Sequence, residues 1–118
     1  MELSVEERQG VHIVRVGGAK MTYPALRDFF ERVRGVIEAS DGHMIIDLQA
    51  VSYIDSASIG CLMDIHRLLQ EKKACLRLSG LQSRVETMIS MTGLHKIIEL
   101  HRDEADAITA AGGGGQDE

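Results

Sequence analysis

The 118-residue sequence contains no tryptophan, and its two tyrosines and two phenylalanines make aromatic residues only 3% of the chain. A hydrophobic core must therefore be built from Leu, Ile, Val, Met and Ala. The two cysteines, Cys61 and Cys75, are too few for a disulfide framework, and both are expected to be small buried side chains in a reducing compartment. Apolar runs of the roughly 20 residues that cross a bilayer are missing as well, and the acidic start Met1–Arg8 does not resemble a signal peptide. The sequence thus predicts a cytoplasmic protein without a membrane partner.

Basic residues are outnumbered, because 13 Lys and Arg against 18 Asp and Glu give a net charge of −5. Binding to a nucleic-acid backbone requires a basic stripe, so nucleic acid is excluded as a partner. The 5 histidines are scattered without metal-ligand spacing, and Gly17-Gly18 lacks the third glycine of a dinucleotide fingerprint. A Gly-x-Ser-x-Gly nucleophile elbow is missing too. We therefore predict no cofactor, no metal and no catalytic residue, that is, a protein that is not an enzyme.

Hydrophobic residues recur with two different periods, which indicates an α/β fold in one domain. Apolar residues at strand spacing predict strands at 3–5, 11–16, 43–48, 76–78 and 97–100. Apolar residues three and four apart predict helices that start near Pro24, at 57, at 83 and at 104. The first two strands form a hairpin, and strands that alternate with helices form a largely parallel sheet. The domain is expected to span 1–111, followed by a flexible Gly-rich, acidic tail at 112–118.

The short helix predicted from residue 83 carries sequence signals at both of its ends. Ser83 and Glu86 have the spacing of a capping box, in which each side chain accepts a hydrogen bond from the other residue's backbone N–H. Gly93 has the position of a glycine that ends a helix in the left-handed conformation. These signals predict a helix that starts at Ser83 and stops before Gly93.

The segment Val51–Gly60 connects the end of a predicted strand to the start of a predicted helix. Its first part is apolar, and the acid Asp55, the hydroxyl of Ser56 and several small residues follow. Ser56 stands at the expected helix N-terminus, where unpaired N–H groups and the helix dipole favour negative charge. One interpretation is a helix cap, because Asp and Ser are preferred N-cap residues. Another is a phosphorylation switch, since the small Ala57, Ser58 and Gly60 leave Ser56 accessible to a kinase. A third, a small hydrolase, would require Ser56 to react with acyl probes.

The loop before the first long helix is expected to lie near Ser56, because loops that follow parallel strands gather at the carboxyl edge of the sheet. Exposed apolar side chains from the two segments would form the kind of patch that marks a protein interface. Met21 and Tyr23 are expected to be partly exposed there. The predicted partner interface comprises Lys20, Met21, Thr22, Tyr23, Ile59, Gly60 and Met63.

The run Ile54–Gly60 resembles the phosphorylation motif of STAS domains, the fold shared by anti-sigma factor antagonists and the cytoplasmic tails of sulphate transporters. Further matches are Val51–Tyr53 before the motif, and the segments 90–94 and 97–98 near the end of the chain. The resemblance extends over roughly 3–110. It implies a STAS fold, that is, a mixed, mostly parallel β-sheet with an N-terminal antiparallel hairpin, packed against about four helices.

The resemblance also implies a bacterial partner-switching regulator of transcription. The unphosphorylated protein would bind an anti-sigma factor that is also a serine kinase, and the kinase would phosphorylate Ser56 and break the complex. A metal-dependent serine phosphatase would then reset the switch. Asp55, Ala57 and Ser58 would support the phosphorylation site, with Asp55 orienting the hydroxyl or capping the helix.

Two positions depart from the family pattern. Ser58 stands where the family usually has glycine, which places a second hydroxyl two residues from the first. The loop that typically reads Gly-Glu-Leu-Asp is here Gly18–Met21, without either acid, so that Lys20 could attract a phosphate. These departures suggest a dedicated kinase. The alternative is a constitutive adaptor subunit of a transporter or stress-sensing assembly, in which Ser56 is only a helix cap.

Overall fold

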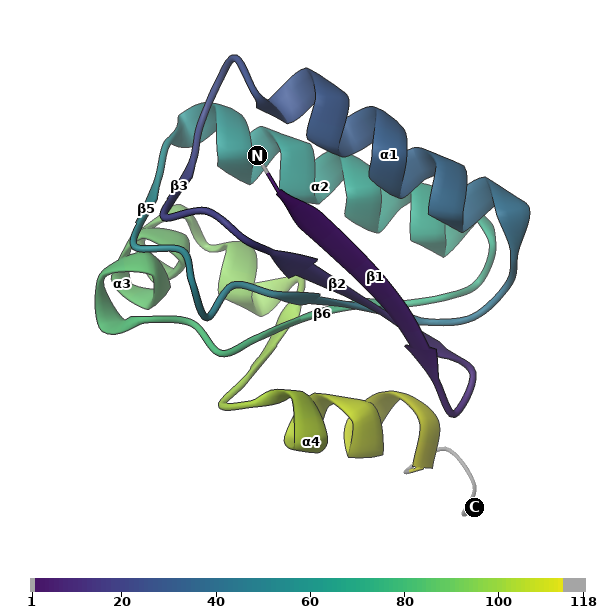
Figure 1. Ribbon diagram of the computed structural model, residues 1–118. Coiled ribbons are helices and arrows are strands. Elements are labelled where there is room, and N and C mark those ends of the chain that lie inside the picture. The colour runs from purple at the N-terminus through teal and green to yellow at the C-terminus, as the bar shows by residue number, and fades with distance from the viewer. Residues whose placement is uncertain (1, 114–118) are drawn as a thin grey trace.

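A computed structural model describes residues 2–113 of the chain and contains two sheets. The main sheet has five strands in the order β1-β2-β4-β6-β7, and Figure 1 shows it beneath a pair of helices. Its strands are β1 (Leu3–Arg8), β2 (Val11–Val16), β4 (Met44–Asp47), β6 (Leu76–Ser79) and β7 (Glu99–His101). β1 pairs antiparallel with β2, and the remaining pairs are parallel. The fold is the mixed α/β arrangement that the sequence predicts.

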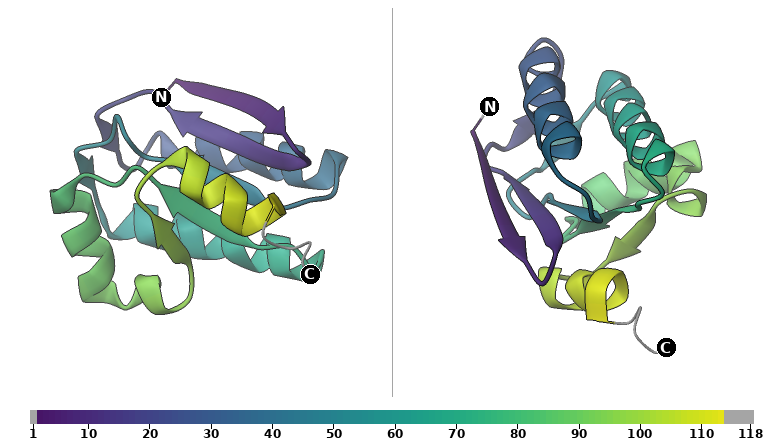
Figure 2. Two further views of the ribbon diagram at one scale, coloured as in Figure 1. Left: turned by 90° about the horizontal axis from the view of Figure 1, so that it is seen from below. Right: turned by 90° about the vertical axis from the view of Figure 1, so that its right-hand side faces the viewer.

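Helices cover both faces of this sheet, as the end-on view in Figure 2 shows. α1 (Leu26–Ala39) and α2 (Ser56–Glu71) lie side by side on one face, and α4 (Glu104–Ile108), continued by η2 (Thr109–Gly113), lies on the other. α3 (Ser83–Thr92) and η1 (Leu94–Lys96) connect β6 to β7. Side chains of β2 therefore alternate between two cores. The smaller core under α4 consists of Val11, Ile13, Ile45, Ala107, Ile108 and Ala111.

The larger core lies between the sheet and the pair α1 and α2. α1 buries Leu26, Phe29, Val33 and Ile37, which recur three and four residues apart and so form one face of the helix. Lys72, the C-cap of α2, joins the C-terminal ends of α1 and α2. Its Nζ donates hydrogen bonds to the carbonyl oxygens of Ile37 at 2.6 Å and Ser40 at 2.8 Å. One charged side chain thus satisfies two carbonyl groups at the end of α1.

Replacing Lys72 with methionine is expected to lower the free energy of unfolding by about 1 kcal/mol, because two charge-assisted hydrogen bonds at a partly exposed site are lost. Urea denaturation would measure the difference. Lys96→Met is the matched control, since Lys96 is exposed on η1. Equal stabilities of the two variants would contradict this role of Lys72.

A second sheet of only two strands, β3 (Lys20–Met21) and β5 (Tyr53–Ile54), is a feature that the sequence analysis does not predict. The strands run parallel, with Lys20 opposite Tyr53 and Met21 opposite Ile54. The backbone N–H groups of Ser52 and Tyr53 also donate to the carbonyl oxygen of Ala19, at 2.8 and 3.1 Å. This pairing holds the loop after β2 directly beside the start of α2, which confirms that the two segments are neighbours.

Several predicted boundaries and burials are wrong. α3 has Gln82 as its N-cap without a side-chain hydrogen bond, so Ser83 is the first helical residue and the predicted capping box does not form. Pro24 precedes α1 instead of standing in its first turn. Cys75, which was expected to be buried, is exposed directly before β6, and the core side chain is that of Leu76. The left-handed glycine after α3 is confirmed, as Gly93 has φ 81°.

Two predictions concern the end of the chain. The last strand is Glu99–His101 and not 97–100, because the N–H groups of Ile97 and Ile98 donate to the carbonyl oxygen of Leu94 in the turn that follows η1. The helical turn η2 extends to Gly113, and the rest of the tail predicted at 112–118 lies outside the described residues.

Candidate functional site

The start of α2 is fixed by a reciprocal pair of hydrogen bonds between Asp55 and Ser58. Asp55 is the N-cap, in extended conformation, and its Oδ1 accepts a hydrogen bond from the Ser58 backbone N–H at 2.9 Å. In return the Asp55 backbone N–H donates to Ser58 Oγ at 2.9 Å, which completes a capping box. Ser56 is the first helical residue and takes no part in this arrangement. The interpretation of Ser56 as the helix cap is therefore wrong.

Ser58 also joins α2 to the loop after β2. Its side chain is completely buried. Its Oγ is in hydrogen-bond contact with the carbonyl oxygen of Met21 and lies 2.7 Å from Asp55 Oδ1. A hydroxyl has one proton, so it donates to one of these acceptors at a time while it accepts from the Asp55 N–H. Ser58 is thus a structural hydroxyl that holds two segments together.

Asp55 connects the same two segments through its second carboxylate oxygen. The Tyr23 backbone N–H donates to Asp55 Oδ2 at 3.3 Å. Partial burial by itself raises the pKa of Asp55, but hydrogen bonds from the Ser58 hydroxyl and from the backbone N–H groups of Ser58 and Tyr23 outweigh it and lower that pKa below its ordinary value. Asp55 is consequently ionised at neutral pH, directly next to the exposed Ser56.

The Ser56 side chain faces solvent at the first turn of α2. Within residues 2–113 its hydroxyl forms no hydrogen bond, in contrast to the fully engaged Ser58. Its neighbour Ala57 is exposed and Gly60 lies one turn further along, so that small residues surround the hydroxyl. The geometry therefore presents one accessible hydroxyl at a positively polarised helix end.

The other residues of the predicted interface differ in how far they reach the surface. Lys20, Tyr23 and Gly60 are exposed, and Thr22, Ile59 and Met63 are partly buried. Tyr23 has 73% of its surface exposed. The expectation that Met21 is exposed is wrong, because its side chain points into the main core and is completely buried. Only the Met21 backbone reaches the site.

A shallow groove beside Ser56 contains residues that the sequence analysis does not identify. It has a volume of about 320 Å³ and lies between the N-terminal halves of α1 and α2. Leu26, Arg27, Phe30 and Asp64 line it together with Tyr23 and residues of the α2 start. The signal in the sequence is the helical spacing of Arg27 and Phe30, which places both on one side of α1, while Tyr23 precedes the helix.

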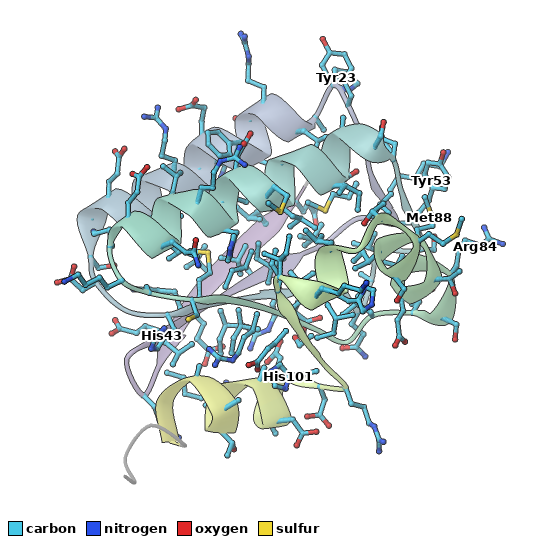
Figure 3. All side chains as sticks on the ribbon, turned by 180° about the vertical axis from the view of Figure 1, so that it is seen from behind. Tyr23, His43, Tyr53, Arg84, Met88 and His101 are labelled. Carbon is cyan, nitrogen blue, oxygen red and sulfur yellow. The ribbon has the colours of Figure 1, made fainter. Side chains whose placement is uncertain are left out.

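The exposed surface continues past Ser56 toward α3. Tyr53, which precedes the site by three residues, has 43% of its surface exposed, and α3 packs beside β5. Figure 3 shows Tyr53, Met88 and Arg84 along one edge of the molecule, with Tyr23 further up the same side. Two exposed aromatic side chains thus belong to this surface, Tyr23 from the loop before α1 and Tyr53 from β5.

Comparison with known proteins identifies the family. The family model of the STAS domain matches residues 2–107, so the chain belongs to the STAS domain family. An anti-sigma-B factor antagonist of Listeria monocytogenes serovar 1/2a is 30% identical over 110 residues, which cover 90% of this chain and 93% of that protein.

Solved structures show the same fold. An anti-sigma factor antagonist from Mycobacterium paratuberculosis aligns with a TM-score of 0.84 and 24% identity, over 93% of this chain and 92% of that one. The Bacillus cell fate determinant SpoIIAA in its phosphorylated form aligns with a TM-score of 0.70 and 15% identity, over 92% and 98%. None of the helices within residues 2–113 combines the length and the apolar character that a membrane crossing requires.

Proposed function

We propose that this protein is an anti-sigma factor antagonist that works by partner switching, with Ser56 as the phosphorylated residue. The observation that carries the proposal is that Ser56 and Ser58 have different structural roles. Ser58 caps the helix and is buried, while Ser56 is exposed with its hydroxyl unengaged. The family and the curated relatives, which are named antagonists of anti-sigma factors, support the class of partner.

Phosphorylation of Ser56 would change the surface without disturbing the fold. A phosphate adds about −1.5 to −2 charges at neutral pH, and the first turn of a helix accommodates negative charge well. The Asp55 carboxylate stands next to it and adds to the local negative potential. A partner whose surface fits the neutral hydroxyl would have to desolvate this charge, so the complex would dissociate.

The binding partner in this proposal is an anti-sigma factor with serine kinase activity, and a metal-dependent serine phosphatase would restore the hydroxyl. The contact surface would contain the exposed residues Lys20, Tyr23 and Gly60 and the partly buried residues Thr22, Ile59 and Met63. The adaptor alternative treats Ser56 as no more than a cap, and Asp55 already has that role. The capping geometry therefore favours the switch.

Intact-mass analysis with site mapping, on protein purified from its native cells, tests the proposal. We expect a single species heavier by one phosphate, located on Ser56, whose amount changes with growth condition. The unphosphorylated protein should capture a serine kinase in a pull-down, and the phosphorylated protein should not. A protein that stays unmodified under every condition, yet remains bound to a stable complex, would instead support the adaptor.

The buried Ser58 is an internal control for the phosphorylation of Ser56. We expect phosphate on Ser56 and none on Ser58, because a kinase cannot reach a completely buried hydroxyl without unfolding the start of α2. Tandem mass spectrometry of the peptide that contains both serines distinguishes the two sites. Phosphate on Ser58 alone would contradict the assignment of the switch.

A further inference from the structure

β1 leaves one long edge of the main sheet open. The strand order β1-β2-β4-β6-β7 places β1 and β7 at the two edges, and no strand within residues 2–113 pairs with the outer side of either. β7 has three residues, and a short edge strand offers little to pair with, whereas β1 has six. In the end-on view of Figure 2, β1 lies at the rim of the molecule, and α1 stands between it and α2. The edge is therefore separate from the surface around Ser56.

β1 lacks the features that usually protect a free edge from pairing. Edge strands are commonly protected by proline, by lysine or by a bulge. β1 reads Leu-Ser-Val-Glu-Glu-Arg, without proline or lysine, and it pairs with β2 one residue to one over Leu3–Arg8, without a bulge. Val5, in the middle of the strand, has 43% of its surface exposed. The strand thus presents a regular open edge with an apolar side chain at its centre.

The hydrogen-bond pattern of the hairpin shows which backbone groups of β1 face outward. The Gly17 N–H donates to the Glu2 carbonyl oxygen at 2.9 Å, so Glu2 belongs to the residues bonded to β2. Bonded pairs alternate along an antiparallel ladder, and the N–H and C=O groups of the residues between them point the other way. These outward residues of β1 are Leu3, Val5 and Glu7. Arg32 Nη2 donates to the Leu3 carbonyl oxygen at 3.5 Å, and this oxygen can accept a second hydrogen bond.

The charges along β1 favour one register for pairing with a second copy of the chain. Two copies of this edge can pair antiparallel about a two-fold axis, which is the commonest symmetry of homodimers. With the axis at Val5, Arg8 lies opposite Glu2 of the second copy, and Glu6 lies opposite Ser4 of the second copy. Arg8 and Glu2 are exposed, and they lie on the same face of the sheet because an even number of residues separates them. Opposite charges therefore meet at both ends of the paired segment.

Neighbouring registers bring like charges together. An axis at Ser4 would place Glu2 opposite Glu6 of the second copy, and an axis at Glu6 would place the two Glu6 side chains opposite each other. An axis at Glu7 would do the same for the two Glu7 side chains and would leave only the end of the strand paired. Like charges directly opposite each other on neighbouring strands are destabilising. The axis at Val5 is thus the register in which opposite charges face each other and most of the strand is paired.

We infer that two copies of this chain associate through β1, in an antiparallel pair centred on Val5, and so extend the main sheet across a two-fold axis. The outward backbone groups of Leu3, Val5 and Glu7 form the hydrogen bonds, and the two Val5 side chains cover each other. The pairs of Arg8 with Glu2 set the register. The contact is small, so we expect a reversible dimer with a dissociation constant on the order of 10–100 µM. This association does not depend on the proposed phosphorylation switch.

Sedimentation velocity of the full chain tests the association and its place on the surface. We expect a reversible shift from the mass of one chain to that of two between about 1 µM and about 1 mM. Val5→Lys should raise the dissociation constant at least about tenfold, because two lysines would face each other across the axis. Ile97→Lys makes a similar change at a position outside β1 that is 52% exposed, and it should leave the association unchanged. A chain that stays monomeric throughout, or equal association of the two lysine variants, would overturn the inference.

Exchanging the charges at the two ends of β1 tests the register. Arg8→Glu and Glu2→Arg should each weaken self-association at least about tenfold, because each variant places like charges opposite one another. A mixture of the two variants should dimerise again, since each variant then meets the opposite charge at both ends. Glu6, which loses its contact with Arg8, keeps the one with Arg15 at 2.8 Å, and amide NMR spectra would show that both variants stay folded. Folded variants that do not associate in the mixture would overturn the inference.

Hydrogen exchange of the unaltered chain is a further test that needs no variant. In the single chain the Val5 and Glu7 amides face solvent, whereas the amides of Ser4 and Glu6 point toward β2. Raising the protein concentration should slow the exchange of the Val5 and Glu7 amides in proportion to the dimer fraction, and it should leave the Ser4 and Glu6 amides unchanged. A dimer in which the Val5 amide exchanges as fast as in the single chain would place the contact elsewhere and overturn the inference.

Discussion

Replacement of Ser58 with alanine is expected to lower the free energy of unfolding by about 2–3 kcal/mol, well above the usual effect of a serine-to-alanine change on a surface. The side chain is completely buried and forms one half of the capping box with Asp55. Its removal leaves the Asp55 backbone N–H and the Met21 carbonyl oxygen without their partner. An unpaired buried polar group costs about 1–3 kcal/mol, and the lost cap adds to this.

Urea denaturation of Ser58→Ala and Ser56→Ala would measure the difference between two serines that are two residues apart. Ser56→Ala should change stability by less than about 0.5 kcal/mol, because its side chain is exposed and makes no contact that the helix needs. Hydrogen exchange should locate the damage in Ser58→Ala at 19–23 and in the first turn of α2. Equal stabilities of the two variants would contradict the structural role of Ser58.

Ser56 and Ser58 also show which features of the site can be predicted from sequence patterns and which cannot. Hydrophobic periods predict the strand exit and the start of α2 to within one residue. The rule that loops gather at the carboxyl edge of a parallel sheet predicts that the loop before α1 lies close to this start. The roles of Ser56 and Ser58 do not follow, because Asp and Ser are both good caps. Which of them caps depends on the residue at which the helix starts, and a shift of one residue turns a side chain by about 100° around the helix axis.

Other features required contacts between residues that lie far apart in the chain. Each strand of the β3–β5 pair has two residues, which is too short for any alternation to be recognised. Met21 is buried because this pairing turns its side chain into the core. The contact between Arg15 and Glu104 spans 89 residues, and it becomes visible only when the strand register brings β2 next to α4. This ion pair was for that reason not predictable from local patterns.

The change with the largest expected effect on function is Ser56→Asp. If the protein binds its partner through the surface around Ser56, we expect this variant to weaken the complex at least about 100-fold, or roughly 2.7 kcal/mol. The reason is that an unpaired charge would have to lose its water in the interface, next to the Asp55 carboxylate, which is ionised at neutral pH. Isothermal titration calorimetry with the captured kinase would measure the affinity.

The stability of the same variant separates a switch from a damaged fold. Aspartate in the first turn of a helix is favourable, so Ser56→Asp should unfold at the same urea concentration as the unaltered chain or slightly higher. Ser83→Asp is the matched control, because Ser83 is the exposed first residue of α3 and the change adds the same charge outside the predicted interface. Loss of affinity in Ser56→Asp alone, with Ser56→Ala still bound, is the outcome expected of a switch. Equal losses in both aspartate variants would mean that the partner responds to net charge, and full binding of Ser56→Asp would mean that Ser56 lies outside the interface.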